Sequence, residues 1–136
     1  MDIQGVTDEV FAVLGTGRQI APFTTRWPEF GLAEAYRVAA GVRARREARG
    51  ERPIGRKIGF TNRTIWSEYN VHAPMWDYVY DVTVRDLRTQ DVDASLSSLA
   101  EPRIEPEIIF GMASAPDPRH GRSGPARVHR LGRSRL

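Results

Sequence analysis

Two glutamates one residue apart are the residues of this sequence with the clearest capacity for chemistry. Glu105 and Glu107 lie in "EPRIEPEIIF", residues 101–110, whose apolar positions predict a strand. Side chains two residues apart on a strand point to the same face, so the two carboxylates would lie side by side. Carboxylate oxygens are ligands that suit Mg²⁺ or Mn²⁺, with water and substrate completing the shell. The alternative is a solvated acidic strand face that binds nothing.

Lys57 is the second candidate, and it is the only lysine in the chain. It lies in "PIGRKIGF", a predicted strand in which Gly55 and Gly59 allow another group to approach the backbone closely. The proton affinity of lysine shifts readily on burial, which suits proton transfer. An ordinary exposed lysine is the alternative. Asp77 and Asp81 flank an aromatic stretch, where they could orient a water or a cation, or could cap a turn.

The elements that must position these residues follow from the apolar spacing. Helical spacing over residues 6–14, with Gly15 after it, predicts a short amphipathic helix. The stretch "LAEAYRVAAGVRARREARG" predicts a second helix with an apolar stripe, a solvated arginine face opposite and a stop at Gly50. Short strands are predicted at 53–60 and within "MWDYVYDVTV", with a capped turn between them. Helices followed by short strands indicate an α+β fold.

Composition narrows the class of protein. The chain has 136 residues, 40% of them hydrophobic, which is enough for one ordinary core. It has no cysteine, so disulfides, thiolate metal sites and a cysteine nucleophile are excluded. No apolar run approaches the roughly 20 residues that cross a bilayer, and the acidic start "MDIQGVTDEV" is not typical of a secretory signal. A cytoplasmic protein without membrane contact is therefore expected.

The positive charge is concentrated at the C-terminal end. Residues 1–111 hold 14 Lys and Arg against 16 Asp and Glu, whereas residues 112–136 hold six Arg against one Asp. Apolar periodicity stops near Pro118, which predicts a domain over 1–118 and a disordered Arg-rich tail over 119–136. The arginines could contact phosphates, but no aromatic platform or nucleic-acid-binding motif accompanies them. Nucleic acid is therefore disfavoured as a partner.

Taken in order, "LAEAYRVA", "GRKIGFTN", "YNVHAPMWDYVYD" and "PRIEPEI" resemble the 2-keto-4-pentenoate hydratase and 4-oxalocrotonate decarboxylase group of the fumarylacetoacetate hydrolase superfamily. The resemblance implies N-terminal helices followed by the first strands of a β-rich domain, and often a homo-oligomer. It implies that Glu105 and Glu107 bind Mg²⁺ or Mn²⁺, and that Lys57 lies beside the substrate. Asp77 falls near an aspartate-containing segment of the family's pocket and is assigned there as a second catalytic residue.

The activity implied by the resemblance is metal-dependent addition of water to 2-keto-4-pentenoate (2-hydroxypenta-2,4-dienoate), a short unsaturated 2-oxo acid of aromatic catabolism. Because both enzymes share these motifs, 4-oxalocrotonate decarboxylase is the alternative. In either reaction, a divalent ion can stabilise negative charge that develops on the 2-oxo oxygen. A non-catalytic remnant or interaction module is the alternative from another class.

The sequence also departs from the family. A third carboxylate ligand lies downstream in family members, whereas the 29 residues after Glu107 contain no glutamate and only Asp117 as an aspartate. "FGMASAPDP" still resembles the family, but "RHGRSGPARVHRLGRSRL" does not. A truncation or frameshift near residue 118 is therefore expected, together with weakened metal binding and little activity.

Overall fold

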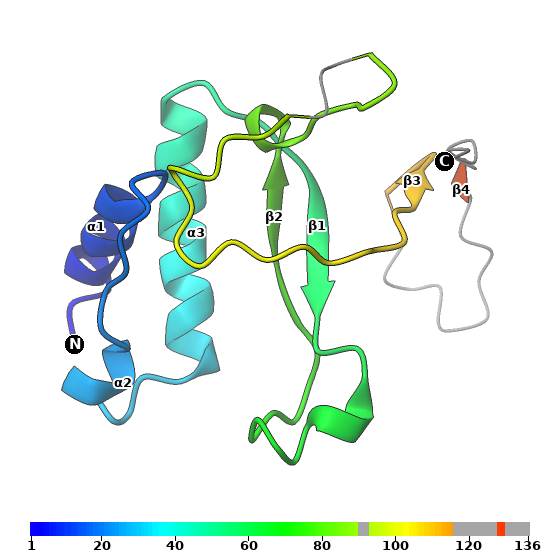
Figure 1. Ribbon diagram of the computed structural model, residues 1–136. Helices are drawn as coiled ribbons and strands as arrows, with labels where there is room; N and C mark the ends of the chain where they lie inside the picture. Colours follow the sequence, from blue (N-terminus) through cyan, green and yellow to red (C-terminus); the bar gives the residue numbers. More distant parts are fainter. Residues whose placement is uncertain (90–92, 116–127, 130–136) are drawn as a thin grey trace. The chain divides into compact units, whose positions relative to one another are not determined.

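The computed structural model describes residues 1–89, 93–115, 128 and 129 (Figure 1). These residues belong to two compact units, Met1–Pro102 and Arg103–Leu136. In chain order, the first unit contains helices α1 (Ile3–Val13), α2 (Phe23–Arg26) and α3 (Leu32–Ala48), strand β1 (Pro53–Gly59), a 3₁₀ turn (Arg63–Ile65), strand β2 (Met75–Tyr80) and a 3₁₀ turn (Asp81–Thr83). Helices precede antiparallel strands, so the predicted α+β class is confirmed.

Local signals in the sequence set the limits of the two long helices. The Asp2 side chain accepts a hydrogen bond of 2.9 Å from the backbone N–H of Gln4, so α1 begins three residues before the predicted start. Gly15 follows α1 with φ +71°, and Gly50 follows α3 with φ +94°, a region that glycine adopts most easily. At the start of α3, Glu34 accepts a hydrogen bond of 3.1 Å from the Gly31 N–H. The predicted helices are thus confirmed.

The contact between α1 and α3 forms the centre of the small core. Val6 and Thr7 on α1 are 2% and 1% exposed, and Val38 on α3 is 6% exposed. Gly41 lies against Thr7 so closely that an added Cβ would be 2.8 Å from the Thr7 Cγ2 atom. Thr7 satisfies its own hydroxyl by donating to the Ile3 carbonyl at 2.7 Å. The two helices therefore approach each other through a position without a side chain.

We expect Gly41→Ala to destabilise the protein by about 1 kcal/mol. Alanine gains about 1 kcal/mol of helix propensity over glycine, but overpacking a filled contact costs about 1–3 kcal/mol, and buried Thr7 has no room to move. Urea unfolding followed by circular dichroism measures the difference. In a Thr7→Ala background the clashing atoms are gone, so the same change should become stabilising. A stabilising Gly41→Ala in the wild-type background would contradict this packing.

Strands β1 and β2 form an antiparallel pair next to α3 (Figure 1). The predicted strand at 53–60 is confirmed, and a bulge lies between Pro53 and Gly55. The second predicted strand ends at Tyr80, because residues 81–83 form a 3₁₀ turn. The turn at 63–65 is capped as predicted, with the Asn62 side chain accepting from the Thr64 N–H at 3.0 Å.

In the second unit, the two-residue strands β3 (Gly111–Met112) and β4 (Val128–His129) pair antiparallel. The strand predicted over 101–110 is wrong, since no strand is assigned to those residues. Pro102 and Pro106 lack the N–H that a strand ladder requires. The apolar side chains of Ile104 and Ile108 are 98% and 83% exposed, so no described residue buries the face that would fix a strand.

Two further predictions concern the chain as a whole. The predicted boundary near residue 118 and most of the predicted tail lie outside the described residues. In the described part of the chain, every helix is too short or too polar to cross a membrane.

Candidate active site

Lys57 and Asp77 lie directly opposite each other in the β1–β2 ladder. Residues in such register share a face of the sheet, with Cβ atoms about 4.5–5.5 Å apart. Both residues are exposed, and the Asp77 carboxylate accepts a hydrogen bond of 2.7 Å from the Tyr78 N–H. The structure thus brings the two predicted catalytic residues together as an ammonium and a carboxylate on one face.

Glycines keep that face of β1 open around Lys57. Gly55 and Gly59 flank Lys57 two residues away on either side, so they share its face. A Cβ at Gly59 would meet no atom within 4 Å, and one at Gly55 would meet only the Val79 Cβ at 4.0 Å. A small molecule can therefore approach the Lys57 side chain across bare backbone on both sides.

The opposite face of the sheet packs on α3 through stacked rings. Tyr36 of α3 stacks on Trp76 with ring centroids 5.2 Å apart, and its hydroxyl accepts from the Trp76 N–H at 3.3 Å. Arg43 lies 4.8 Å from the centre of the Tyr78 ring and donates to the Tyr78 hydroxyl at 3.2 Å. These contacts cover the face of β2 that carries Trp76 and Tyr78, the two neighbours between which Asp77 lies in the strand.

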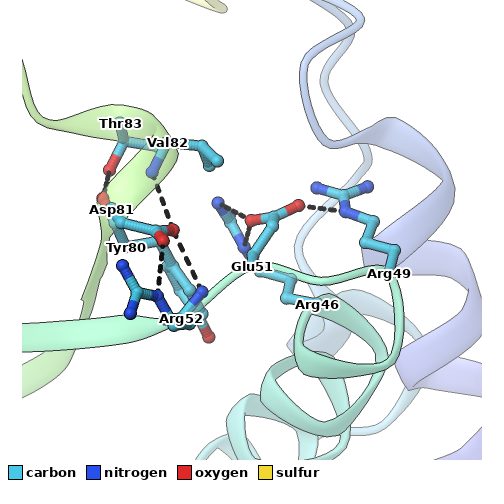
Figure 2. A network of polar contacts seen from close by, with 8 residues as sticks. All are labelled: Arg46, Arg49, Glu51, Arg52, Tyr80, Asp81, Val82 and Thr83. Carbon is cyan, nitrogen blue, oxygen red and sulfur yellow. Dashed lines mark hydrogen bonds and ion pairs between the residues drawn. The ribbon is translucent and has the colours of Figure 1, made fainter.

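Charged residues hold the segment between α3 and β1 in two places, Glu51 at the end of α3 and Arg52 beside Asp81 (Figure 2). Glu51 is 8% exposed and lies between Arg46, which donates through Nε at 2.6 Å, and Arg49. Burial by itself would raise the pKa of Glu51, but the hydrogen bonds from Arg49 and Arg46 lower it below the usual glutamate value. This role of Glu51 was not predicted, because its only signal in the sequence is one glutamate directly after an arginine-rich stretch.

Asp81 belongs to the same region and joins the residue before β1 to the turn after β2. Its carboxylate accepts from the backbone N–H and the Nε of Arg52 at 3.0 and 3.1 Å, and from the Val82 N–H at 2.9 Å (Figure 2). The backbone hydrogen bond from Arg52, followed by its side-chain hydrogen bond, lowers the pKa of Asp81. Asp81 was predicted either to orient a water or a cation or to have a local structural role. These hydrogen bonds support the local structural role.

Glu105 and Glu107 lie in the second unit, in the exposed segment to which no strand is assigned. The strand geometry from which the two carboxylates were predicted to lie side by side is therefore not found, and their role as metal ligands stays a prediction. Two exposed carboxylates match the donor type of Mg²⁺, which keeps several waters and uses one or two carboxylates. Among residues 1–89, 93–115, 128 and 129, no group of three or more His, Cys, Asp or Glu side chains is placed to hold a metal ion together.

Comparison with known proteins gives a consistent group of relatives. No family model matches the chain. It is 34% identical over 104 residues to 2-hydroxyhexa-2,4-dienoate hydratase of Comamonas testosteroni, a match covering 74% of this chain and 38% of the relative. It is also 34% identical over 92 residues to 4-oxalocrotonate decarboxylase of Pseudomonas sp. strain CF600, covering 67% of this chain and 33% of the relative.

A solved structure shares the arrangement of helices and strands. The 4-oxalocrotonate decarboxylase from Pseudomonas putida G7, complexed with magnesium and adipate, matches with a TM-score of 0.56 and 26% identity. The match covers 59% of this chain and 30% of the decarboxylase. The chain thus spans roughly a third of the length of the relatives it matches. The chain is therefore similar, over about a third of their length, to enzymes of the 2-keto-4-pentenoate hydratase and 4-oxalocrotonate decarboxylase group.

Proposed function

We propose that this chain carries part of the active site of a divalent-metal-dependent lyase that adds water to 2-keto-4-pentenoate. The observation that carries the proposal is the cross-strand pair Lys57 and Asp77, on an open sheet face, in a chain similar to a dienoate hydratase. Such a substrate bears a carboxylate and a 2-oxo group, so an ammonium on an accessible face suits its charge. A homo-oligomer acting in the cytoplasm completes the proposal.

Each residue has a role that follows from its chemistry. Lys57 would hold the anionic substrate and move a proton, and the Asp77 carboxylate opposite it would orient a water. Glu105 and Glu107 would bind Mg²⁺ or Mn²⁺. When bound, the ion would supply Lewis-acid stabilisation of charge at the 2-oxo oxygen. The magnesium and adipate in the decarboxylase from Pseudomonas putida G7 support a divalent ion and a carboxylate ligand here.

Decarboxylation of 4-oxalocrotonate is the second candidate. The identity to a decarboxylase equals the identity to a hydratase, at 34%, and the solved structure is that of a decarboxylase. Two assays on the 136-residue chain with Mg²⁺ separate the reactions. Loss of 2-hydroxypenta-2,4-dienoate absorbance favours the hydratase, and release of CO₂ from 4-oxalocrotonate favours the decarboxylase. In either assay, Lys57→Met should remove the turnover, and unchanged turnover would exclude Lys57 from the site.

Metal binding tests the site apart from turnover. We expect the chain to bind Mn²⁺, measured by the electron paramagnetic resonance signal of the free ion. Glu105→Gln/Glu107→Gln should weaken binding by at least about tenfold, since losing even indirect partners of a metal costs about 10–100-fold. Glu29→Gln/Glu68→Gln is the matched control, because it removes two exposed glutamates of the first unit. Equal binding by both double variants, or no binding by the wild type, would overturn the metal assignment.

A further inference from the structure

A cavity of about 250 Å³ lies among α1, α3 and β2 in the first unit, and Asp77 is the one residue of the proposed reaction that lines it. Its lining is mainly aliphatic, with Val10, Val38, Ala39 and Val42 among its members, and it also includes one cation, Arg46, and one anion, Asp77. A dry apolar cavity of about 150 Å³ is large enough for benzene. The space here therefore suits one aromatic ring with a small substituent.

Tyr80 supplies a polar group to this apolar space. The residue lines the cavity and is 5% exposed. Its hydroxyl makes no hydrogen bond to any described residue, unlike the hydroxyls of Tyr36 and Tyr78. In the described part of the chain, every fully buried side-chain nitrogen or oxygen has a hydrogen-bond partner. The Tyr80 hydroxyl has no such partner, so it is not fully buried and reaches accessible space. A hydroxyl in that position can donate to a ligand at no cost to existing hydrogen bonds.

The charges around Tyr80 favour a neutral occupant. Arg46 and Arg43 act on Tyr80 as cations, whereas Asp77 and Glu47 act on it as anions. Burial, the largest influence, raises the pKa of Tyr80, so its hydroxyl remains protonated at neutral pH. Because the two pairs of charges oppose each other, neither a cationic nor an anionic ligand gains from the local field.

We propose that this cavity is a binding site for a neutral single-ring phenol. The ring lies among the aliphatic side chains of α1 and α3, and the phenol oxygen accepts a hydrogen bond from the Tyr80 hydroxyl. Asp77 belongs to both this cavity and the Lys57 face, but the two sites differ in chemistry, because the cavity holds an uncharged ring and not a 2-oxo acid. The proposal stands without the proposed function.

A titration of the 136-residue chain with phenol tests the proposal. We expect concentration-dependent shifts of the Val38 and Ala39 methyl signals in proton–carbon correlation spectra. Toluene lacks the oxygen and should bind more weakly, and benzoate carries a charge and should bind more weakly than phenol. No shift at Val38 and Ala39 up to the solubility limit of phenol, or tighter binding of benzoate, would overturn the proposal.

Three variants locate the ligand. Tyr80→Phe should weaken phenol binding about 3- to 10-fold, the effect of one hydrogen bond, and should leave toluene binding unchanged. Ala39→Leu fills the cavity and should abolish binding of both molecules. Ala40→Leu, an exposed position of the same helix, is the control and should change neither. Equal phenol binding by the Ala39→Leu and Ala40→Leu variants would place the ligand elsewhere and reject the site.

Discussion

Replacing Glu51 by glutamine is expected to destabilise the first unit by about 3 kcal/mol. Breaking a buried ion pair by removing one partner costs about 3–5 kcal/mol, because the remaining charge stays buried without compensation. Arg46, which is 13% exposed, would be left in that state, whereas Arg49 is 47% exposed and can turn to water. Glutamine keeps one hydrogen-bonding oxygen, so we expect the lower end of that range. Urea unfolding at neutral pH measures the loss.

Glu47→Gln is the matched control for this prediction. Glu47 also pairs with an arginine, Arg43, at 2.9 Å, but its side chain is 40% exposed. Exposed pairs contribute about 0–1 kcal/mol, so this variant should unfold nearly like the wild type. Equal destabilisation by the two variants would show that burial of Glu51 does not determine its contribution.

The same network predicts how stability changes with pH. The folded-state pKa of Glu51 is lower than its unfolded value, so the unfolded chain takes up the proton first as the pH falls. The contribution of Glu51 to stability is therefore present above the ordinary glutamate pKa and is lost as the pH falls through the folded value. The Glu51→Gln variant should lack that part of the acid sensitivity. Parallel stability curves for the two proteins would contradict this linkage.

Replacing Tyr80 by alanine is expected to cost about 3–5 kcal/mol, the usual loss for a buried aromatic ring. The ring is 5% exposed, and the Arg46 guanidinium lies 3.7 Å from its centre. The change therefore removes both packing and a cation–π contact. Such a loss is a large part of the stability of an ordinary domain.

Tyr80→Phe provides the contrast, since it keeps the ring and removes only a hydroxyl without a hydrogen bond to described residues. We expect its unfolding midpoint to equal that of the wild type within about 0.5 kcal/mol. Urea unfolding of both variants measures the two effects. A costly Tyr80→Phe change would mean that the hydroxyl has a structural partner, and would also remove the basis for the phenol site.

Local structure and the resemblance to a family can be inferred from the sequence alone. Helix α1 and helix α3 are encoded by apolar spacing, by Asp2 before α1 and by glycines after both helices. Strand β1 is encoded by a short run between Pro53 and Gly59. Each of these signals acts within a few residues along the chain, so periodicity and capping rules are sufficient to find them. The ordered motifs likewise pointed to the hydratase and decarboxylase group, which the relatives confirm.

Which residues that are distant in sequence come into contact follows from the tertiary structure. The arginines of α3 were predicted as a solvated face, yet Arg43 stacks on Tyr78 and Arg46 stacks on Tyr80 and pairs with Glu51. A guanidinium can cover an aromatic ring as well as face water, and the sequence does not say which it does.

The failed strand prediction at residues 101–110 and the pairing of Lys57 with Asp77 have the same physical cause. A strand exists only when a partner strand satisfies its backbone groups and buries one face, and that partner is remote in sequence. The apolar run around Glu105 and Glu107 resembles a strand but pairs with none in the described residues. Lys57 and Asp77 are 20 positions apart in the numbering, and only the register of β1 with β2 sets them opposite each other. Local pattern therefore fixed the elements of this protein, and long-range pairing fixed its candidate site.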